Sequence, residues 1–201
     1  MLKHTKFAAG ISNFIGKLFA WLPIHPNSIT ILSVIMALLG YITWLPGLEY
    51  KFESIMLFAF AFFFDAIDGA IARAKKLESK EGAFLDGIAD RVVEFFLILA
   101  LFKIYAFNIE ITIMLFFIMF FGTGMTSFVK AYAEHSGVIS HARAITMPGW
   151  LERPERSLLL LAVYGTVIMG YTSVASGLVY ITAGLTVLTF LQRMIMVILN
   201  R

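Results

Sequence analysis

The sequence contains no cysteine, and only 14% of its 201 residues are charged. The absence of cysteine excludes disulfide bonds and thiolate metal sites. Soluble domains carry nearer a quarter of charged residues, whereas 60% of this chain is hydrophobic. The basic residues are spread along the chain and form no recognisable nucleic-acid-reading module, so we expect no nucleic-acid partner. An apolar excess of this size predicts an all-α integral membrane protein.

Long apolar segments predict six transmembrane helices. Short turns and loops separate the helices, and Asn27 or Ser28 is expected to cap the first. The predicted spans are Ile29–Pro46, Phe52–Lys76, Gly82–Phe107, Ile109–His135, Trp150–Tyr171 and Ser173–Asn200. The segments between them, including LESKE and HSGVISHARAITMPG, are expected to be loops. Residues 27–200 would then form a six-helix bundle within a single domain, 1–201.

The N-terminal segment, residues 1–22, differs from the spans. Its apolar residues, among them Phe7, Ile11, Phe14 and Leu18, follow helical spacing. The segment contains Lys17 and has no small-residue cleavage site at its end, so it is not typical of a secretory signal. It predicts an N-terminal amphipathic interfacial helix. A short soluble helix packed on the protein's own surface is the alternative.

The distribution of lysine and arginine indicates the orientation in the membrane. Six spans place both termini on one side. Of the 16 lysines and arginines, all but Lys51 and Lys103 fall on that side. Because basic loops favour the cytoplasm, we expect a multi-pass protein of the cell membrane with both termini and the loop around residues 73–82 in the cytoplasm.

Four aspartates interrupt the apolar sequence at the cytoplasmic ends of the second and third predicted helices. Asp65 and Asp68 are three residues apart, and Asp86 and Asp90 are four apart, so each pair shares a helix face and both pairs can point into one gap. Such carboxylates repel one another and take up protons unless cations neutralise them. Mg²⁺ prefers oxygen ligands and often binds carboxylates together with a substrate phosphate. The pattern predicts a Mg²⁺ or Mn²⁺ site that handles phosphate. A pathway for cation or proton transport is the alternative.

The same stretch resembles the signature of the CDP-alcohol phosphotransferase family, in the form Asp65-x2-Asp68-Gly69-x2-Ala72-Arg73-x8-Gly82-x3-Asp86-x3-Asp90. Members of that family transfer a phospho-alcohol from a CDP-linked donor to an acceptor hydroxyl and release CMP. The resemblance implies two divalent cations held by Asp65, Asp68 and Asp86, with Asp90 on the second cation. Asp90 would also be the general base that takes the proton from the acceptor hydroxyl.

The resemblance further implies a site for a CDP-linked lipid. The run PNSIT matches the family's P-N-x-[IL]-T run before the first span. Gly69 and Arg73 would contact the cytidine diphosphate with help from Ser79, although Arg73 could instead be a salt partner of the aspartates. The residues implied for the donor site are Asn27, Ser28, Ile29, Thr30, Ile31, Gly69, Ala72, Arg73, Ser79 and Gly82.

Three cations near the cytoplasmic ends of the last three spans suggest an acceptor that itself carries phosphate. Lys130, Arg153 and Arg193 are expected at similar depth, and arginine pairs bidentately with phosphate. Cations here could instead extend to anionic lipid head groups, which fits Arg156 and Arg201 better than Arg193.

The runs ERPER and SxxKA resemble the branch of the family that uses inositol phosphate, which comprises the phosphatidylinositol phosphate and archaetidylinositol phosphate synthases. By that resemblance, Lys130, Arg153 and Arg193 would hold the acceptor phosphate, and a homodimer is expected. Tyr132 stands where many of these relatives have a second basic residue. A phosphatidylglycerophosphate synthase that uses glycerol phosphate is therefore the alternative.

Overall fold

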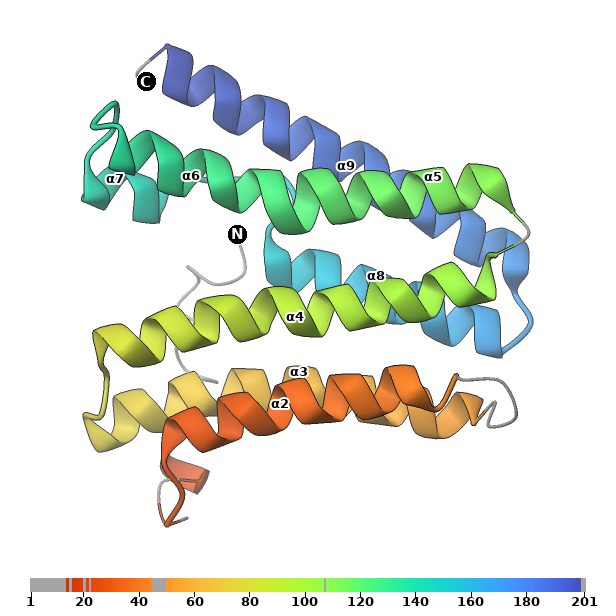
Figure 1. The fold of residues 1–201 in the computed structure, drawn as a ribbon, viewed down its shortest axis with the longest axis horizontal. Coiled ribbons are helices and arrows are strands. Elements are labelled where there is room, and N and C mark those ends of the chain that lie inside the picture. The colour runs from red at the N-terminus through yellow and green to blue at the C-terminus, as the bar shows by residue number, and fades with distance from the viewer. Residues whose placement is uncertain are drawn as a thin grey trace. The chain divides into compact units, whose positions relative to one another are not determined.

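The computed structural model describes residues 14, 16–19, 21, 23–44, 50–106 and 108–199, and every regular element among them is a helix (Figure 1). The chain divides into two compact units, Leu2–Lys103 and Ile104–Arg201. The prediction of an all-helical protein is confirmed. Three of the described helical segments are long and apolar enough to cross a membrane, namely Lys51–Lys75, Ile109–His135 and Thr172–Ile198.

The N-terminal unit contains α2 (Pro26–Ile42), α3 (Lys51–Lys75) and α4 (Lys80–Ile104). Helices α2 and α3 lie side by side (Figure 1). Gly40 lies at their contact, where a Cβ would be only 3.2–3.3 Å from the Phe58 ring, tighter than an ordinary van der Waals contact. The buried Ser54 hydroxyl also donates a hydrogen bond to the Gly40 carbonyl at 2.7 Å. Glycine therefore permits the close approach of the two helices.

A short turn joins α3 to α4. Lys76 ends α3 in the left-handed conformation, with φ of 56°, and the Leu77 N–H donates to the Ala72 carbonyl at 2.9 Å. Three residues later, the Ser79 Oγ accepts a hydrogen bond from the Gly82 N–H at 2.9 Å, which satisfies a backbone donor in the first turn of α4. A connection this short makes α3 and α4 neighbours at their polar ends.

The C-terminal unit begins with α5 (Ile109–Phe117), the π-helix η2 (Ile118–Met125) and α6 (Thr126–His135), which follow one another without a break. The short α7 (His141–Thr146), α8 (Arg153–Ile168) and α9 (Thr172–Ile198) complete the unit. Helix α9 contacts α5, η2, α6 and α8. It is therefore the element around which this unit packs.

The structure corrects three local predictions. Helix α2 begins at Pro26 and is capped by His25, whose Nδ1 accepts from the Asn27 N–H at 3.3 Å, so the predicted cap at Asn27 or Ser28 is wrong. Proline is well suited to a first helical position because it has no N–H to satisfy. The predicted loop after His135 contains α7, and the fourth predicted span contains η2.

The predicted interfacial helix, residues 1–22, falls mostly outside the described residues. Residues 16–19 are helical. At Gly16, a Cβ would lie 2.6 Å from the Ala70 carbonyl oxygen of α3. This short piece of helix therefore packs directly on α3.

Candidate active site

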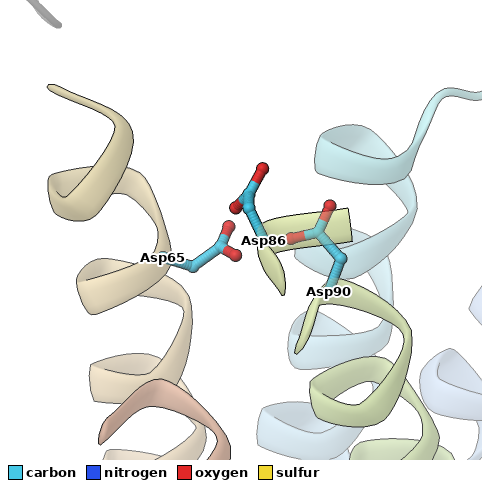
Figure 2. Close-up of side chains that lie close together, drawn as sticks. All are labelled: Asp65, Asp86 and Asp90. Carbon is cyan, nitrogen blue, oxygen red and sulfur yellow. The ribbon is translucent and has the colours of Figure 1, made fainter. Parts of the chain in front are cut away.

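Three aspartate side chains converge between α3 and α4. Figure 2 shows Asp65 of α3 facing Asp86 and Asp90 of α4. One carboxylate oxygen from each residue lies within 4.8 Å of the other two. Asp86 and Asp90 share a face because they are one helical turn apart, and the short turn between the helices places Asp65 opposite them.

The donor set of this three-aspartate cluster fits a hard divalent cation. All three ligand atoms are carboxylate oxygens, which Mg²⁺ and related ions prefer. Around octahedral Mg²⁺, adjacent ligand oxygens lie about 3.0 Å apart and opposite ones about 4.2 Å, so the three carboxylates would close by up to about 1.8 Å to share one ion. Without a cation, the negative charges repel one another in a half-buried setting. Asp65, Asp86 and Asp90 are thus well placed to hold a metal.

Asp68 turns away from the cluster toward α2. It is 3% exposed, and its Oδ2 accepts a hydrogen bond from the Thr30 hydroxyl at 2.5 Å. Residues three apart on a helix differ by about 60° in direction. This is enough for Asp65 to face α4 while Asp68 faces α2. The structure therefore brings together three of the four carboxylates expected in one gap, and the metal-ligand role of Asp68 stays a prediction.

A cavity of ≈ 170 Å³ lies beside the aspartates, between the starts of α2 and α4 and the end of α3. Asp68 and Asp86 both line it. The other predicted donor-site residues in its wall are Asn27, Thr30, Gly69, Ala72, Arg73, Ser79 and Gly82. Asp86 belongs to this cavity and to the three-aspartate cluster, so a ligand in the cavity would lie against a potential metal ligand.

Three residues predicted for the donor site are not in the cavity wall. Ile29 is buried against Ile67 and Ile71, and Ile31 is 52% exposed. Ser28 is also absent from the wall, whereas Leu77 and Glu78 of the connecting turn line it. The prediction assigned every residue from Asn27 to Ile31 to the donor site, although successive residues of a helix point in different directions. The start of α2 at Pro26 directs only some of these side chains into the cavity.

Arg73 and Gly69 form one wall of the cavity together. The Arg73 Nη1 lies 3.4 Å from the position of a Cβ at Gly69, so the guanidinium folds back over the glycine one turn earlier. The positive charge of Arg73 thus belongs to a cavity wall that also contains Asp68 and Asp86. This arrangement suits a phosphate group that would contact both the guanidinium and a metal.

Arg91 is a neighbour of the cluster that the sequence analysis did not single out. Its Nη1 lies 3.7 Å from the Asp90 Oδ2 and donates to the Gly87 carbonyl at 2.5 Å. The sequence signal that could have identified Arg91 is its position directly after Asp90, the last aspartate of the motif. The contact places a positive charge beside the carboxylate that the family resemblance implies as the general base.

The three predicted acceptor-site cations all belong to the C-terminal unit. Arg193 of α9 is 7% exposed, and its Nη1 donates to the Thr126 carbonyl at 3.0 Å. Lys130 lies one turn after Thr126 on α6. Arg153 begins α8, and its neighbour Glu152 interacts electrostatically with Arg193. Arg193 is therefore hydrogen-bonded to the helix that carries Lys130, and it interacts electrostatically with the residue before Arg153.

Arg156 differs from its sequence interpretation. Extension to lipid head groups, the alternative that fits Arg156 better than Arg193 in the sequence, does not agree with its burial at 4% exposure in the C-terminal unit. The reason is Gly122 of η2. A Cβ there would lie 3.0 Å from the Arg156 Cδ, so the absence of a side chain admits the arginine.

Comparison with known proteins decides the family. The family model for CDP-alcohol phosphatidyltransferase matches residues 23–198. The chain belongs to the CDP-alcohol phosphatidyltransferase family. Within this family, the chain is 32% identical over 181 residues to archaetidylinositol phosphate synthase of Pyrococcus horikoshii, a match that covers 89% of this chain and 86% of the relative.

Two crystal structures of phosphatidylinositol phosphate synthase from Mycobacterium tuberculosis share the fold of this phosphatidyltransferase. The structure with CDP-DAG bound has a TM-score of 0.74 at 26% identity and covers 94% of each chain. The complex with manganese and citrate has a TM-score of 0.75 at 26% identity, over 92% of this chain and 88% of that one. The membrane fold of the family thus agrees with the three long apolar helices described above.

Proposed function

We propose that the protein transfers a phosphatidyl-type group from a CDP-linked lipid to a hydroxyl of an inositol phosphate and releases CMP, in phospholipid biosynthesis. The observation that carries this proposal is the position of Asp86, which belongs both to the three-aspartate cluster and to the adjacent cavity. The names of the relatives support the inositol phosphate acceptor, and the bound CDP-DAG in one of them supports the lipid donor.

Two divalent cations, Mg²⁺ or Mn²⁺, complete the proposed site. Asp65, Asp86 and Asp90 would hold them, together with Asp68 after a change of rotamer. Bound divalent cations would neutralise phosphate charge and polarise the bond to be broken. The manganese complex of the mycobacterial relative supports this assignment.

The residues of the chain have distinct roles in the proposed reaction. Arg73, folded over Gly69, would bind the diphosphate of the donor in the cavity. The acceptor hydroxyl oxygen forms a bond to the phosphorus that carries the lipid, and the bond from that phosphorus to CMP breaks, so that CMP leaves with the electron pair. Asp90 takes the proton of the hydroxyl. Asn27, Thr30, Ala72, Ser79 and Gly82 would shape the rest of the donor site.

The acceptor would bind through its phosphate to Lys130, Arg153 and Arg193. Arginine forms bidentate hydrogen bonds with phosphate, and Arg193 is held in place by backbone carbonyls of Thr126 and Pro148. A fixed guanidinium loses little side-chain entropy on binding.

For the membrane arrangement, we propose six spans formed by α2, α3, α4, the α5–η2–α6 segment, α8 and α9. Residues 1–22 would form the interfacial helix of a single domain that assembles as a homodimer. Both termini and the active site would face the cytoplasm. Because the chain has no cysteine, Lys51→Cys and Lys80→Cys provide unique labels. In sealed cells, an impermeant thiol reagent should modify only the Lys51→Cys variant. Labelling of Lys80→Cys alone would invert the proposed orientation.

An acceptor screen with a labelled CDP-lipid tests the reaction. The purified protein with Mg²⁺ or Mn²⁺ should release CMP fastest with inositol phosphate, compared with glycerol phosphate, serine and free inositol. Asp90→Asn should abolish turnover while CDP-lipid binding survives, whereas Glu53→Gln, an exposed change on α3, should have no effect. Preference for glycerol phosphate would refute the acceptor assignment. Normal turnover by Asp90→Asn would refute the general-base role.

A further inference from the structure

The C-terminal unit buries two cations. Among the lysines and arginines that the structure describes, Arg156 and Arg193 are the two that are buried, at 4% and 7% exposure. Arg193 interacts electrostatically with Arg156 as well as with Glu152. Two buried guanidinium groups repel each other and are costly to desolvate unless negative charge offsets them. The proposed acceptor site uses Arg193 and leaves Arg156 without a role.

The space that Arg156 occupies is created by the π-helix η2. At Gly122, a Cβ would lie 3.0 Å from the Arg156 Cδ and 3.1 Å from its Nε, and 2.9 Å from the Thr186 Cγ2. Any other residue at this position would displace the arginine or Thr186. Gly124, in the same π-helix, has only the Met119 carbonyl oxygen near its Cβ position, at 3.9 Å. π-helical turns frequently occur at functional sites, so this space is a candidate ligand site.

Buried hydroxyl groups in the helices that surround this space point to a ligand. The side-chain oxygens of Thr123, Ser157 and Thr186 are buried, and the described part of the structure offers them no hydrogen-bond partner. Thr186 lies beside Arg156, since both approach the Cβ position of Gly122, at 2.9 and 3.0 Å, whereas Thr123 and Ser157 belong to the same helices, η2 and α8. Buried hydroxyls are normally hydrogen-bonded, and those without a protein partner call for a water molecule or a ligand.

A phosphate monoester could bind to both buried arginines. It carries a charge of about −1.5 to −2 near neutral pH, and Arg156 and Arg193 are close enough to interact electrostatically. One doubly charged group would therefore match the two guanidinium groups.

We propose that Arg156 is a specificity-determining residue of the acceptor site, which binds the phosphate of the polyol together with Lys130, Arg153 and Arg193. Gly122 is the residue that permits this by leaving room for the guanidinium. The inference rests on the proposed function. It adds an interaction that a phosphorylated acceptor gains and an unphosphorylated polyol lacks.

Two pairs of variants test this role. Arg156→Gln should raise the KM for inositol phosphate by at least about tenfold, the effect of losing one charge-assisted contact, and leave the KM for the CDP-lipid within about twofold. Arg156→Lys should restore part of the loss. Gly122→Ala should raise the acceptor KM in the same direction because it displaces the arginine, whereas the matched change Gly124→Ala should leave both constants unchanged.

Equilibrium binding separates this inference from the reaction itself. Calorimetric titration with inositol phosphate, without the CDP-lipid, should show tighter binding to the unaltered protein than to Arg156→Gln. Equal binding, or an equal rise in both KM values, would overturn the role of Arg156 while the reaction stands. Absence of CMP release by the unaltered protein with every acceptor would overturn the proposed function, and the calorimetric comparison would still decide the role of Arg156.

Discussion

Replacing Asp65 by asparagine should change stability in opposite ways with and without a divalent cation. Oxygens of Asp65, Asp86 and Asp90 lie within 4.8 Å of one another. At an effective dielectric constant near 20, two charges at that distance repel by about 3.5 kcal/mol. The variant removes two of the three repulsive pairs, or about 7 kcal/mol.

We therefore expect Asp65→Asn to be more stable than the unaltered protein in a chelator, by several kcal/mol. With Mn²⁺ at 100 times its Kd, the unaltered protein should gain about 2.7 kcal/mol. Loss of a carboxylate ligand that weakens binding a hundredfold would reduce this gain to about 0.4 kcal/mol. The cation should thus raise the melting temperature of the unaltered protein clearly and that of the variant hardly at all.

Thermal unfolding in detergent, followed by circular dichroism in EDTA and in Mn²⁺, measures both effects. Glu53→Gln removes an exposed carboxylate from the same helix and should change neither melting temperature. The electrostatic reasoning fails if Asp65→Asn melts below the unaltered protein in EDTA. The metal assignment fails if the variant retains the full response to Mn²⁺.

Two further predictions concern the cavity. Thr30→Val should destabilise the protein by about 2 kcal/mol because it removes a hydrogen bond from the buried Asp68 carboxylate; Thr30→Ser should be nearly neutral in the same unfolding assay, and equal losses in both variants would contradict the hydrogen-bond explanation. Gly82→Ala should raise the KM for the CDP-lipid, since its Cβ would lie 3.0 Å from the Ser79 Oγ in the cavity wall. Gly87→Ala, which meets only the Arg91 Nη1 at 3.6 Å, is the matched control, and an equal rise in KM for both would refute the steric argument.

The aspartate motif could be predicted because its spacing is local. Asp86 and Asp90 share a face of any α-helix, and a short turn must bring α3 next to α4. The direction of Asp68 could not be predicted in this way. Its orientation depends on Thr30, which is 38 residues away on a helix whose start the sequence misplaced. A helical wheel places Asp65 and Asp68 on one face, and only a long-range partner such as Thr30 decides where the Asp68 carboxylate points.

The burial of Arg156 could not be predicted from the sequence for a similar reason. An arginine near a predicted helix end normally extends to water or lipid head groups. Only the π-helix and Gly122 show that an interior position is open to it. Gly122 lies in the run IMFFGTGM, but no local sequence pattern connects this glycine with Arg156, 34 positions later.

The shared position of Asp86 implies that ligand binding at the two neighbouring sites is thermodynamically linked. A cation at the three-aspartate cluster would offset negative charge in the wall of the adjoining cavity, so an anionic ligand there would bind more tightly. Linkage is reciprocal, and the same ligand must therefore raise the affinity for the cation by the same factor. Cation affinities measured on the protein alone would then underestimate those of the enzyme during turnover.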